Sequence, residues 1–400
     1  MKILIVNKFL HPNGGSETYI FRLGQQLEKM GHEVQYFGME HEGRIVGNRA
    51  EIYTTDMDFH TGKLTKILYP FKIIYSVEAG KKIRRVLEDF HPDVVHLNNF
   101  NFQLTPSILY ETDRYRRASK RKVRIVFTAH DSQLVCPNHL MQQFINRERC
   151  TRCIEGSPWN CAKYRCIHGS FVKSLIGSME AFLYRSLKTY RLIDTAVCPS
   201  RFLKEKMDTC PGLRGKTVVM HNFVETEKGG GAEKSKEPFV LYFGRYSREK
   251  GIDTLLKVCE KLPNIPFVFA GAGELEDQVN RMKNIVNKGF LRGRELADLI
   301  GSASFSVFPS ECNENCPFAV MESLLYGTPV IGADIGGVSE LIEDGRTGLL
   351  FESGDEEQLR SRIRLLWNDR EKLNLLQKEC GETEFDSVES YCEKLMKYYV

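Results

Sequence analysis

Short apolar runs alternate with stretches of helical hydrophobic spacing in the first half of this chain. Residues 3–6 form the first apolar run, and a helix-spaced stretch follows that ends at Gly31. Strands are predicted at 3–6, 34–37, 94–97, 123–128, 195–198 and 218–220, and a long helix at 171–190. Strands that are separated by helices indicate a parallel sheet with crossover helices.

The same alternation starts again in the second half. Strands are predicted at 239–243, 267–270, 305–308, 329–332 and 348–351. Helices are predicted at 252–262, near 275–284, at 294–302 and at 338–342, and a long helix after Asp355. Between the halves, residues 223–237 are rich in glycine and charged residues, which is typical of a linker.

The chain has 400 residues, which is too long for one ordinary core and favours two domains. We therefore predict an α/β fold of two Rossmann-like, doubly wound domains that face each other across a cleft. The predicted boundaries are 1–222 for the first domain, with a cysteine-rich insert at 136–166, 223–237 for the linker and 238–383 for the second domain. We expect residues 384–400 to form a helix that packs back on the first domain.

Composition narrows the class of protein. A hydrophobic content of 42% and a charged content of 27% are those of a globular protein, and a net charge of +4 gives no reason to expect a nucleic-acid partner. The N-terminus predicts a buried strand rather than a signal peptide, and we find no run of about 18 apolar residues that would span a membrane. Without a signal peptide, 12 cysteines favour a reducing compartment, so we expect a cytoplasmic protein.

The stretch 310–324 combines a loop, a helix start and two carboxylates. The apolar run 305–308 leads into it, and Pro317 suits the first turn of a helix. Glu314 precedes that helix and Glu322 lies inside it. The first N–H groups of a helix form an anion site, so we expect a diphosphate here, with a sugar on one side and a ribose on the other. Eight residues apart across the helix start, the carboxylates do not resemble the acid–base pair of a hydrolase.

Two further motifs follow predicted strands of the first half. Gly14-Gly15 precedes a helix, where glycine lets the backbone approach a ligand closely; an ordinary strand-to-helix turn is the alternative. His130 follows the strand 123–128 and could bond a substrate hydroxyl, although a lone histidine is more often structural. The dinucleotide fingerprint Gly-x-Gly-x-x-Gly is absent, which disfavours a nicotinamide dehydrogenase.

Two cations follow the first strand of the second half. Arg245 comes after Gly244, and Lys250 precedes Gly251. An arginine fork and a lysine point charge at a strand end suit a diphosphate. The alternative is a solvated loop, because Arg248 and Glu249 are charged as well.

The motifs of the second half together resemble a known family. Glu314-x7-Glu322 is followed by Gly327-Thr328-Pro329, by Gly336-Gly337-Val338-Ser339-Glu340 and by Gly345-x-Thr347-Gly348. With Gly244-Arg245-x4-Lys250-Gly251 and Gly14-Gly15, this pattern resembles the retaining family-four glycosyltransferases (glycosyl transferases group 1) of the GT-B fold, of the kind found in bacterial polysaccharide biosynthesis. One difference is that the family commonly has a Phe-Gly pair soon after the first glutamate, where this chain has Asn315-Cys316-Pro317-Phe318.

The resemblance implies roles for these residues. The second domain would bind the nucleotide sugar and the first the acceptor. Arg245 and Lys250 would bind the diphosphate, and Glu322 the ribose. Glu314 would contact the donor sugar, helped by the backbone N–H groups of Phe318 and Ala319. From the first domain, His130 would lie by the donor sugar and Gly14-Gly15 by the diphosphate and the acceptor.

The family transfers sugars with retention of configuration and usually without a metal. The resemblance therefore implies a hexosyltransferase that uses a nucleotide sugar, with UDP and GDP both open as the base, and a glycan or lipid-linked acceptor. The alternatives are an epimerase or glycogen-type synthase of the same fold, or a non-catalytic sugar-nucleotide-binding scaffold protein. Loss of Arg245, Lys250 or Glu322 would have indicated a scaffold, and all three are present.

Five of the 12 cysteines fall between residues 136 and 166. Cys150-x2-Cys153 has the spacing of a metal-ligand pair, and Cys161-x4-Cys166 provides a second pair; Cys136 is the fifth. We expect structural zinc, with free thiols and an iron–sulfur site as the alternatives. Catalytic zinc is disfavoured because four thiolates leave no open position.

A basic run extends from Arg114 to Arg124, with seven cations and no acid. One interpretation is a solvated loop between a helix and a strand. The other is peripheral contact with anionic lipid at the inner face of the membrane, which attracts each basic residue by roughly 1 kcal/mol. Two tyrosines near this run are not enough to indicate nucleic acid.

Overall fold

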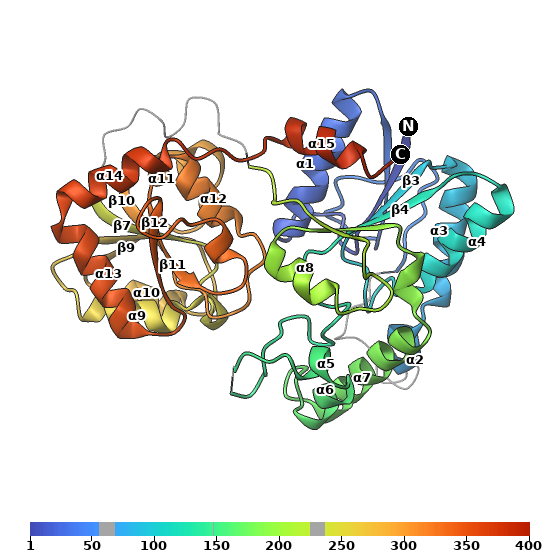
Figure 1. The fold of residues 1–400 in the computed structure, drawn as a ribbon, viewed down its shortest axis with the longest axis horizontal. Helices are drawn as coiled ribbons and strands as arrows, with labels where there is room; N and C mark the ends of the chain where they lie inside the picture. Colours follow the sequence, from blue (N-terminus) through green and yellow to red (C-terminus); the bar gives the residue numbers. More distant parts are fainter. Residues whose placement is uncertain (56–68, 147, 225–236) are drawn as a thin grey trace. The chain divides into compact units, whose positions relative to one another are not determined.

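The computed structural model describes residues 1–55, 69–146, 148–224 and 237–400. Residues 225–236 of the predicted linker lie outside the described residues. The described chain forms two compact units, Met1–His221 together with Val388–Val400, and Asn222–Ser387. Each unit contains one six-stranded sheet in which all neighbouring strands are parallel (Figure 1). These two sheets, flanked by helices, confirm the predicted α/β fold class.

The sheet of the first unit has the strand order β2-β1-β3-β4-β5-β6. Its strands are β1 (Lys2–Val6), β2 (Glu33–Phe37), β3 (Val94–Leu97), β4 (Arg124–Thr128), β5 (Thr195–Cys198) and β6 (Thr217–Val219). All four residues of β3 are buried, as expected for a strand covered on both faces. β2 pairs with one edge of β1, and β3 then pairs with the other edge. The strand order therefore reverses between β1 and β3, which makes this the topological switch point of the sheet.

The helices of the first unit vary widely in length. They are α1 (Gly15–Lys29), α2 (Tyr69–Ile74), α3 (Val77–Phe90), α4 (Ser107–Ser119), α5 (Arg152–Glu155), α6 (Trp159–Lys163), α7 (Phe171–Ser186), α8 (Arg201–Met207) and α15 (Val388–Met396). Figure 1 shows α5, α6 and α7 grouped together, away from the sheet of this unit. The helix predicted over 171–190 ends at Ser186, and a 3₁₀ turn over Thr189–Leu192 follows.

The C-terminal segment belongs to the first unit. The hydroxyl of Tyr391, in α15, lies 3.0 Å from the hydroxyl of Tyr19 in α1. The hydroxyl of Tyr399 lies 2.6 Å from Nδ1 of the buried His96 in β3. These hydrogen bonds connect the C-terminal segment to α1 and to β3, which lie on either side of the switch point.

The sheet of the second unit has the order β12-β11-β10-β7-β8-β9. Its strands are β7 (Glu237–Phe243), β8 (Phe267–Ala270), β9 (Ile285–Asn287), β10 (Ala303–Phe308), β11 (Val330–Asp334) and β12 (Gly348–Glu352). Alternate residues of β7 enter two different cores: Val240 and Tyr242 pack into one, Phe239 and Leu241 into the other. This alternation follows from the two-residue period of a strand whose faces are both covered.

Six helices cover this second sheet. They are α9 (Ile252–Glu260), α10 (Glu276–Arg281), α11 (Gly293–Ser302), α12 (Phe318–Leu325), α13 (Glu356–Asn368) and α14 (Arg370–Cys380). Two predictions were wrong in detail. The single long helix expected after Asp355 is divided in two at Asp369, whose side chain accepts a hydrogen bond from the Lys372 N–H and starts α14. The helix expected at 338–342 is a short 3₁₀ turn, Val338–Glu340.

None of the helices in the described ranges is both long enough and apolar enough to cross a membrane.

Candidate active site

The predicted donor residues follow two neighbouring strands of the second unit. β7 and β10 pair in parallel, and the strand order reverses between them, with β8 and β9 on one side and β11 and β12 on the other. Gly244 and Arg245 follow β7, while the loop that carries Glu314 follows β10. Ligands of open parallel sheets bind at the carboxyl ends of the strands at such a switch point. The topology therefore brings these two loops to the place where a ligand is expected.

Lys250 and Glu314 form an ion pair between these loops. Nζ of Lys250 lies 2.5 Å from Oε1 of Glu314, and their side chains are only 24% and 12% exposed. Burial by itself favours the uncharged forms, but the lysine charge keeps the pKa of Glu314 below its usual range and the glutamate charge raises the pKa of Lys250. Both groups are therefore charged at neutral pH.

Three further groups orient Glu314. Its Oε1 also accepts a hydrogen bond from Oγ of Ser310 at 2.7 Å and one from Sγ of Cys312 at 3.6 Å. Its backbone carbonyl accepts a hydrogen bond from the Gly337 N–H at 2.7 Å. Gly336 has a φ of +61°, and a Cβ on it would lie 2.1 Å from that same carbonyl oxygen. Glycine is needed at 336 because any other side chain would push the Glu314 backbone out of place.

The Lys250 loop is held just as closely. Gly251 has a φ of +73°, and a Cβ on it would lie 1.8 Å from the carbonyl oxygen of Pro309, the residue after β10. The carbonyl of Glu249 accepts hydrogen bonds from the backbone N–H of Glu311 at 3.0 Å and of Cys312 at 3.2 Å. These contacts fix the two loops to each other, so Lys250 and Glu314 have little freedom to separate.

Arg245 lies beside this pair but points to solvent. Its side chain is 72% exposed, and its guanidinium lies 3.8 Å from the carboxylate of Glu249. Its backbone carbonyl accepts a hydrogen bond from the hydroxyl of Tyr242 at 2.7 Å. Its charge opposes the rise in the pKa of Lys250, so the two cations lie within electrostatic reach of each other. An exposed guanidinium next to a partly buried ammonium is suited to binding an anion with several charges.

The helix α12 begins after Pro317, as predicted. Phe318 and Ala319 form its first turn and are partly buried, and Glu322 lies one turn further on, also partly buried. The Val320 N–H donates to the Pro317 carbonyl at 3.2 Å, whereas the first N–H groups of any helix have no acceptor in a preceding turn. The helix start is therefore oriented as an anion site.

In the first unit, Gly14 and Gly15 are exposed at the start of α1. The loop beside them rests on a buried network. The carboxylate of Glu17 accepts hydrogen bonds from the amide of Asn7 at 2.9 Å and from the hydroxyl of Ser16 at 2.8 Å. The amide of Asn99 donates to the same hydroxyl at 2.9 Å. Asn7 follows β1 and Asn99 follows β3, so the network spans the switch point of this sheet.

His130 follows β4 at the same end of this sheet. Its Nε2 lies 2.9 Å from Oδ1 of Asn98, and its ring meets the ring of Tyr19 edge-on, with 4.9 Å between the centroids. Burial lowers the pKa of His130 to about 4, so the imidazole is neutral at pH 7. In this neutral form, Nε2 carries the hydrogen that the Asn98 oxygen accepts.

The structure thus groups the predicted residues within each unit. Lys250, Glu314 and Arg245 lie together in the second unit, and Tyr19 connects the Gly14-Gly15 helix to His130 in the first. Sequence reasoning missed the residues that orient them, such as Asn98, Ser310 and Cys312. Asn98 could have been found, because it follows a predicted strand in the same way as His130 does.

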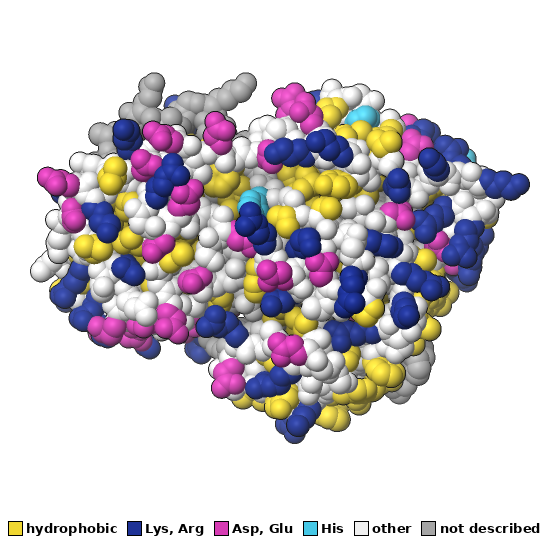
Figure 2. Space-filling view, viewed as in Figure 1, with side chains coloured by type: hydrophobic (Ala, Val, Ile, Leu, Met, Phe, Trp, Pro, Cys, Tyr) yellow, Lys and Arg dark blue, Asp and Glu magenta, His cyan; other side chains and the backbone are white. Residues whose placement is uncertain are grey.

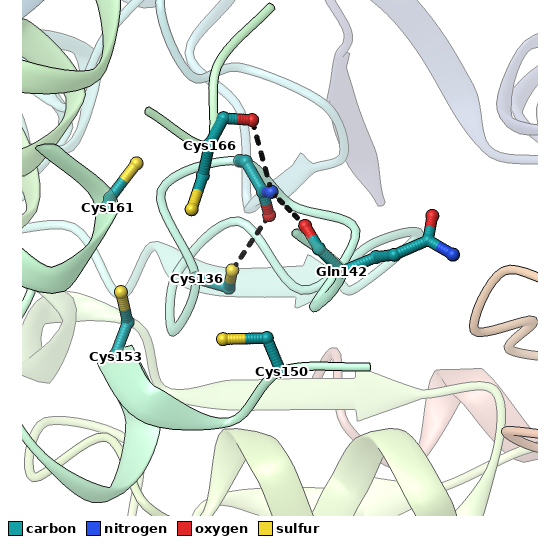
Figure 3. Close-up of a pocket in the computed structure, with 7 residues that line it drawn as sticks. Cys136, Gln142, Cys150, Cys153, Cys161 and Cys166 are labelled. Atoms are coloured by element: carbon teal, nitrogen blue, oxygen red, sulfur yellow. Dashed lines mark hydrogen bonds between the residues drawn. The ribbon is translucent and has the colours of Figure 1, made fainter. Parts of the chain in front are cut away.

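The five cysteines of the insert line one small cavity together with Asn138 and Gln142 (Figure 3). Cys136, Cys153, Cys161 and Cys166 are buried and Cys150 is partly exposed; all five are free thiols. Within the described ranges, no group of three or more His, Cys, Asp or Glu side chains is placed so that it could hold a metal ion as it stands.

The basic run differs from its predicted form. Arg114, Arg116 and Arg117 lie in the last turns of α4 rather than in a loop. Arg114 pairs with Glu111 at 2.7 Å, and Arg116 and Arg117 both pair with Asp113, at 2.8 and 2.7 Å. These acids lie three or four residues before their partners, which neutralises much of the run.

Comparison with known proteins agrees with this geometry. The family described as "Glycosyltransferase Family 4" matches residues 13–228, and "Glycosyl transferases group 1" matches residues 223–382. The chain is 33% identical over 153 residues to the sulfoquinovosyl transferase SQD2 of Arabidopsis thaliana, a match that covers 37% of this chain and 30% of that protein. It is 23% identical over 363 residues to an uncharacterized 42.6 kDa protein in the cps region of Klebsiella pneumoniae, covering 85% of this chain and 87% of that protein.

Solved structures support the fold. HepE of Anabaena, crystallised in complex with UDP and glucose, superposes with a TM-score of 0.67 at 17% identity, covering 99% of this chain and 98% of HepE. The match to "Glycosyltransferase Family 4", over residues 13–228, alone spans more than half of the 400 residues. The chain therefore belongs to glycosyltransferase family 4, whose members are retaining hexosyltransferases of the GT-B fold.

Proposed function

We propose that this chain transfers a hexose from a UDP-sugar to a hydroxyl of a glycan or lipid-linked acceptor, with retention of configuration. One observation carries the proposal. The Lys250–Glu314 ion pair joins the loops that follow β7 and β10, the two strands at the switch point of the second sheet; exposed Arg245 lies in the first loop, and the second leads into α12. UDP is favoured over GDP because HepE, which shares the fold, was crystallised with UDP and glucose.

The difficult step in this chemistry is departure of a diphosphate from an oxocarbenium-like sugar. Arg245, Lys250 and the first N–H groups of α12 would stabilise the charge that develops on the leaving phosphate. The departing phosphate can then accept the proton of the acceptor hydroxyl on the same face of the sugar, which accounts for retention. No separate general base is required on this route.

Glu314 has two tasks in this proposal. Its carboxylate keeps Lys250 charged, and its position before α12 suits a contact with hydroxyls of the donor sugar. Glu322, one turn inside α12, would bind the ribose hydroxyls.

The first unit would supply the acceptor side. Gly14-Gly15 allows close approach of a ligand to the start of α1, and His130, neutral at pH 7, would lie by the donor sugar. A neutral histidine suits this binding task better than a cation would, because the transition state already carries positive charge on the sugar.

The proposal also includes a pathway, polysaccharide biosynthesis, and a cellular location, the cytoplasm. A polysaccharide pathway is supported by the similarity to a protein of a cps region. Cytoplasmic location is supported by the 12 cysteines, all of which are free thiols.

The test is a donor screen with the full chain. Release of nucleoside diphosphate is measured from UDP-, GDP- and ADP-sugars in the presence of membrane extract as the acceptor, and the anomer of the product is read by NMR. We expect turnover with a UDP-sugar, an α-anomer from an α-donor, and a loss of about 10²–10³-fold in kcat for each substitution Arg245→Ala and Lys250→Ala.

A matched control removes two cations away from the site. Lys257 and Lys261 pair with Glu356 on the surface, so the variant Lys257→Ala/Lys261→Ala should retain its turnover. Near-normal transfer by Arg245→Ala/Lys250→Ala would refute the phosphate assignment. Tight binding of UDP-sugar with no turnover on any acceptor would favour the scaffold alternative.

A further inference from the structure

Five thiols meet in the insert of the first unit. Figure 3 shows the sulfur atoms of the five cysteines surrounding a common space. They come from separate segments: Cys153 lies in α5, Cys161 in α6, and Cys136, Cys150 and Cys166 in the connecting loops. Thiols that are only small core residues would not be expected to gather from five positions around one cavity.

The insert also has a small apolar core of its own. Its helices α5 and α6 have only four and five residues. Its apolar cluster consists of Cys153, Cys161 and Cys166 with partly buried Tyr164 and Ile167. A segment with so small a core needs a cross-link or a metal to stay folded.

The contacts separate four of the thiols from the fifth. Sγ of Cys136 donates a hydrogen bond to Oδ1 of Asn138 at 3.0 Å, whereas Sγ of Cys153 makes a longer one, 3.8 Å, to the Pro158 carbonyl. Cys161 and Cys166 are close neighbours, since the Cys166 N–H donates a hydrogen bond to the Cys161 carbonyl at 3.0 Å. The ligands of one zinc ion must also be close neighbours, because two thiolates about 2.3 Å from a tetrahedral ion lie about 3.8 Å apart. An iron–sulfur cluster spreads its thiolates over several metal ions.

The guanidinium of Arg152 lies next to these thiols. Nη1 of Arg152 lies 3.7 Å from Sγ of Cys150, and the Arg152 charge also acts on Cys166. The Arg152 guanidinium lies over the ring of Tyr164, 4.6 Å from its centroid. Four thiolates on one zinc ion carry a net charge of −2, and a fixed guanidinium beside them would offset part of it.

We propose that Cys150, Cys153, Cys161 and Cys166 bind one structural zinc ion, with Arg152 as a positioning residue beside it. The thiols line one cavity, but no three of these described side chains are placed to hold a metal ion as they stand, so binding would have to turn them inward and release their protons. Four protein ligands leave no open position, so the ion would hold the insert and take no part in sugar transfer.

The test measures metal content and its consequence for folding. The full chain is purified, supplied with Zn²⁺ under reducing conditions and desalted, and its metals are measured by elemental analysis. We expect one zinc per chain, loss of that zinc in Cys161→Ser, and retention in Cys210→Ser, which removes a buried thiol outside the cluster. Replacement by Co²⁺ should give the visible spectrum of a tetrahedral tetrathiolate site.

Three results would overturn the proposal. The first is a content of less than about 0.2 zinc per chain with all five thiols titratable, and the second is the presence of iron together with sulfide. The third is full retention of zinc in both Cys161→Ser and Cys153→Ser. If Cys161→Ser does not fold, the wild-type chain decides: a chelator should release one zinc and lower the melting temperature, and an unchanged melting temperature would count against a structural ion.

A separate observation concerns α7, whose buried and exposed faces are reversed. Its buried residues are Ser174, Gly177, Ser178, Glu180 and Tyr184. Its exposed residues include Phe171 at 52%, Val172 at 62%, Met179 at 44%, Phe182 at 49% and Leu183 at 39%. A surface helix normally turns its apolar face inward, so an outward apolar face indicates a partner.

The buried face of α7 explains the reversal. Oγ of Ser178 donates to the Pro158 carbonyl at 2.9 Å and accepts from the Ala162 N–H at 3.0 Å. Oγ of Ser174 accepts from the Ile167 N–H at 2.9 Å. These serines satisfy backbone groups of the insert, which has few helical bonds of its own. The inner face is therefore polar, and the apolar side chains remain on the outside.

Most exposed charges in the segment that carries this face are positive. Lys163, Arg165, Lys173 and Lys188 are exposed, and the only acid between residues 157 and 193 is Glu180, which is buried; exposed Glu155, in α5, lies just before this stretch. The ring of Trp159, 41% exposed, lies 5.7 Å from that of Phe182 and extends the apolar face. Figure 2 shows yellow and dark blue side chains, with a few magenta ones, over the region of α5–α7.

We infer that this α7 face docks on the surface of an anionic lipid bilayer. Aromatic and aliphatic side chains rimmed by lysine and arginine are typical of helices that lie in the membrane interface. The charge sign favours anionic lipid over a second copy of this chain, because two copies of a positive face repel each other. This surface replaces the largely paired basic run 114–124 as the expected membrane contact.

Flotation with lipid vesicles tests the inference without any need for turnover. We expect binding to phosphatidylcholine vesicles that rises at least tenfold with added phosphatidylglycerol and falls with salt. Val172→Asp/Phe182→Asp should abolish binding. Phe290→Asp, which alters a side chain 72% exposed in the second unit, should not. Vesicle binding that does not depend on anionic lipid, or that is unchanged in Val172→Asp/Phe182→Asp, would overturn the inference. A chain that forms a dimer through this face and does not bind vesicles would overturn it as well.

Discussion

The ion pair between Lys250 and Glu314 gives the sharpest test of how the donor site is built. Glu314→Gln removes the negative charge while keeping the size and shape of the side chain. The pair is 2.5 Å long, and the two side chains are 24% and 12% exposed. The amide oxygen of glutamine can still accept the hydrogen bond from Ser310, which is 2.7 Å in the wild-type chain. The substitution therefore isolates the charge.

The burial sets the expected magnitude. Breaking a fully buried pair costs about 3–5 kcal/mol because a lone charge is left behind, whereas an exposed pair contributes about 0–1 kcal/mol. This pair lies between those limits, so Glu314→Gln should lower the free energy of unfolding by about 1–3 kcal/mol. In a unit of this size, each kcal/mol should lower the melting temperature by about 2–4 °C.

A double-mutant cycle measures the coupling directly. Glu314→Gln, Lys250→Met and the double variant are unfolded in urea as full chains. The double variant should lose about 1–2 kcal/mol less than the sum of the single losses. The exposed pair Arg84–Glu88, 3.1 Å long in α3, serves as the control and should couple by less than about 0.5 kcal/mol. Coupling no larger than this control would refute the reasoning.

The pH dependence of the cycle gives a second check. The folded-state pKa of Glu314 is depressed from 4.5, so its contribution is present above pH 4.5 and is lost as the pH falls through the folded value. The folded-state pKa of Lys250 is raised from 10.5, so its contribution is lost only as the pH rises above 10.5. The coupling energy should therefore be constant between pH 5 and 9. A slope within that window would contradict the assignment.

Three further predictions follow from single positions. Gly251→Ala should destabilise the chain by at least about 2 kcal/mol, because its Cβ would meet the Pro309 carbonyl, whereas Gly345→Ala, with a φ of +80° and open space around it, should cost only about 1 kcal/mol in the same urea assay. Burial raises the pKa of Glu180 to about 8, so the free energy of unfolding should fall as the pH rises from 4.5 to 8. Glu180→Gln should therefore have a higher melting temperature than the wild-type chain at pH 8.5 but not at pH 4. Equal melting temperatures at pH 8.5 would contradict this prediction. The NMR signals of the His130 ring should not titrate between pH 6 and 8, since burial lowers its pKa to about 4; a midpoint near 6.5 would show that it is not buried as described.

The sequence predicted the parts of the fold that local patterns control. The apolar runs located β7 and β10, and Pro317 located the start of α12. Because parallel strands share their carboxyl edge, residues after different strands could be assigned to one site without knowing the strand order.

The partners of these residues could not be predicted in the same way. Lys250 and Glu314 are 64 positions apart, and only the pairing of β7 with β10 brings them together. The division of the last long helix depended on the capping role of Asp369, which breaks a stretch with continuous helical spacing.

The faces of α7 were equally hidden in the sequence. Its spacing predicted a helix, but the apolar stripe would ordinarily be assigned to the core. Only the serine bonds to the backbone of the insert show that the polar side lies inside. The basic run, in contrast, could have been recognised as paired, because Glu111 and Asp113 lie at helical spacing before its arginines.

Calorimetric titration of the full chain with UDP tests the central claim most directly. We predict that UDP binds with a stoichiometry of one per chain, and that Arg245→Ala and Lys250→Ala each weaken the affinity at least tenfold, while Lys257→Ala/Lys261→Ala leaves it unchanged. UDP that binds the Arg245→Ala/Lys250→Ala variant as tightly as it binds the wild-type chain would contradict the claim that the diphosphate lies between β7 and β10.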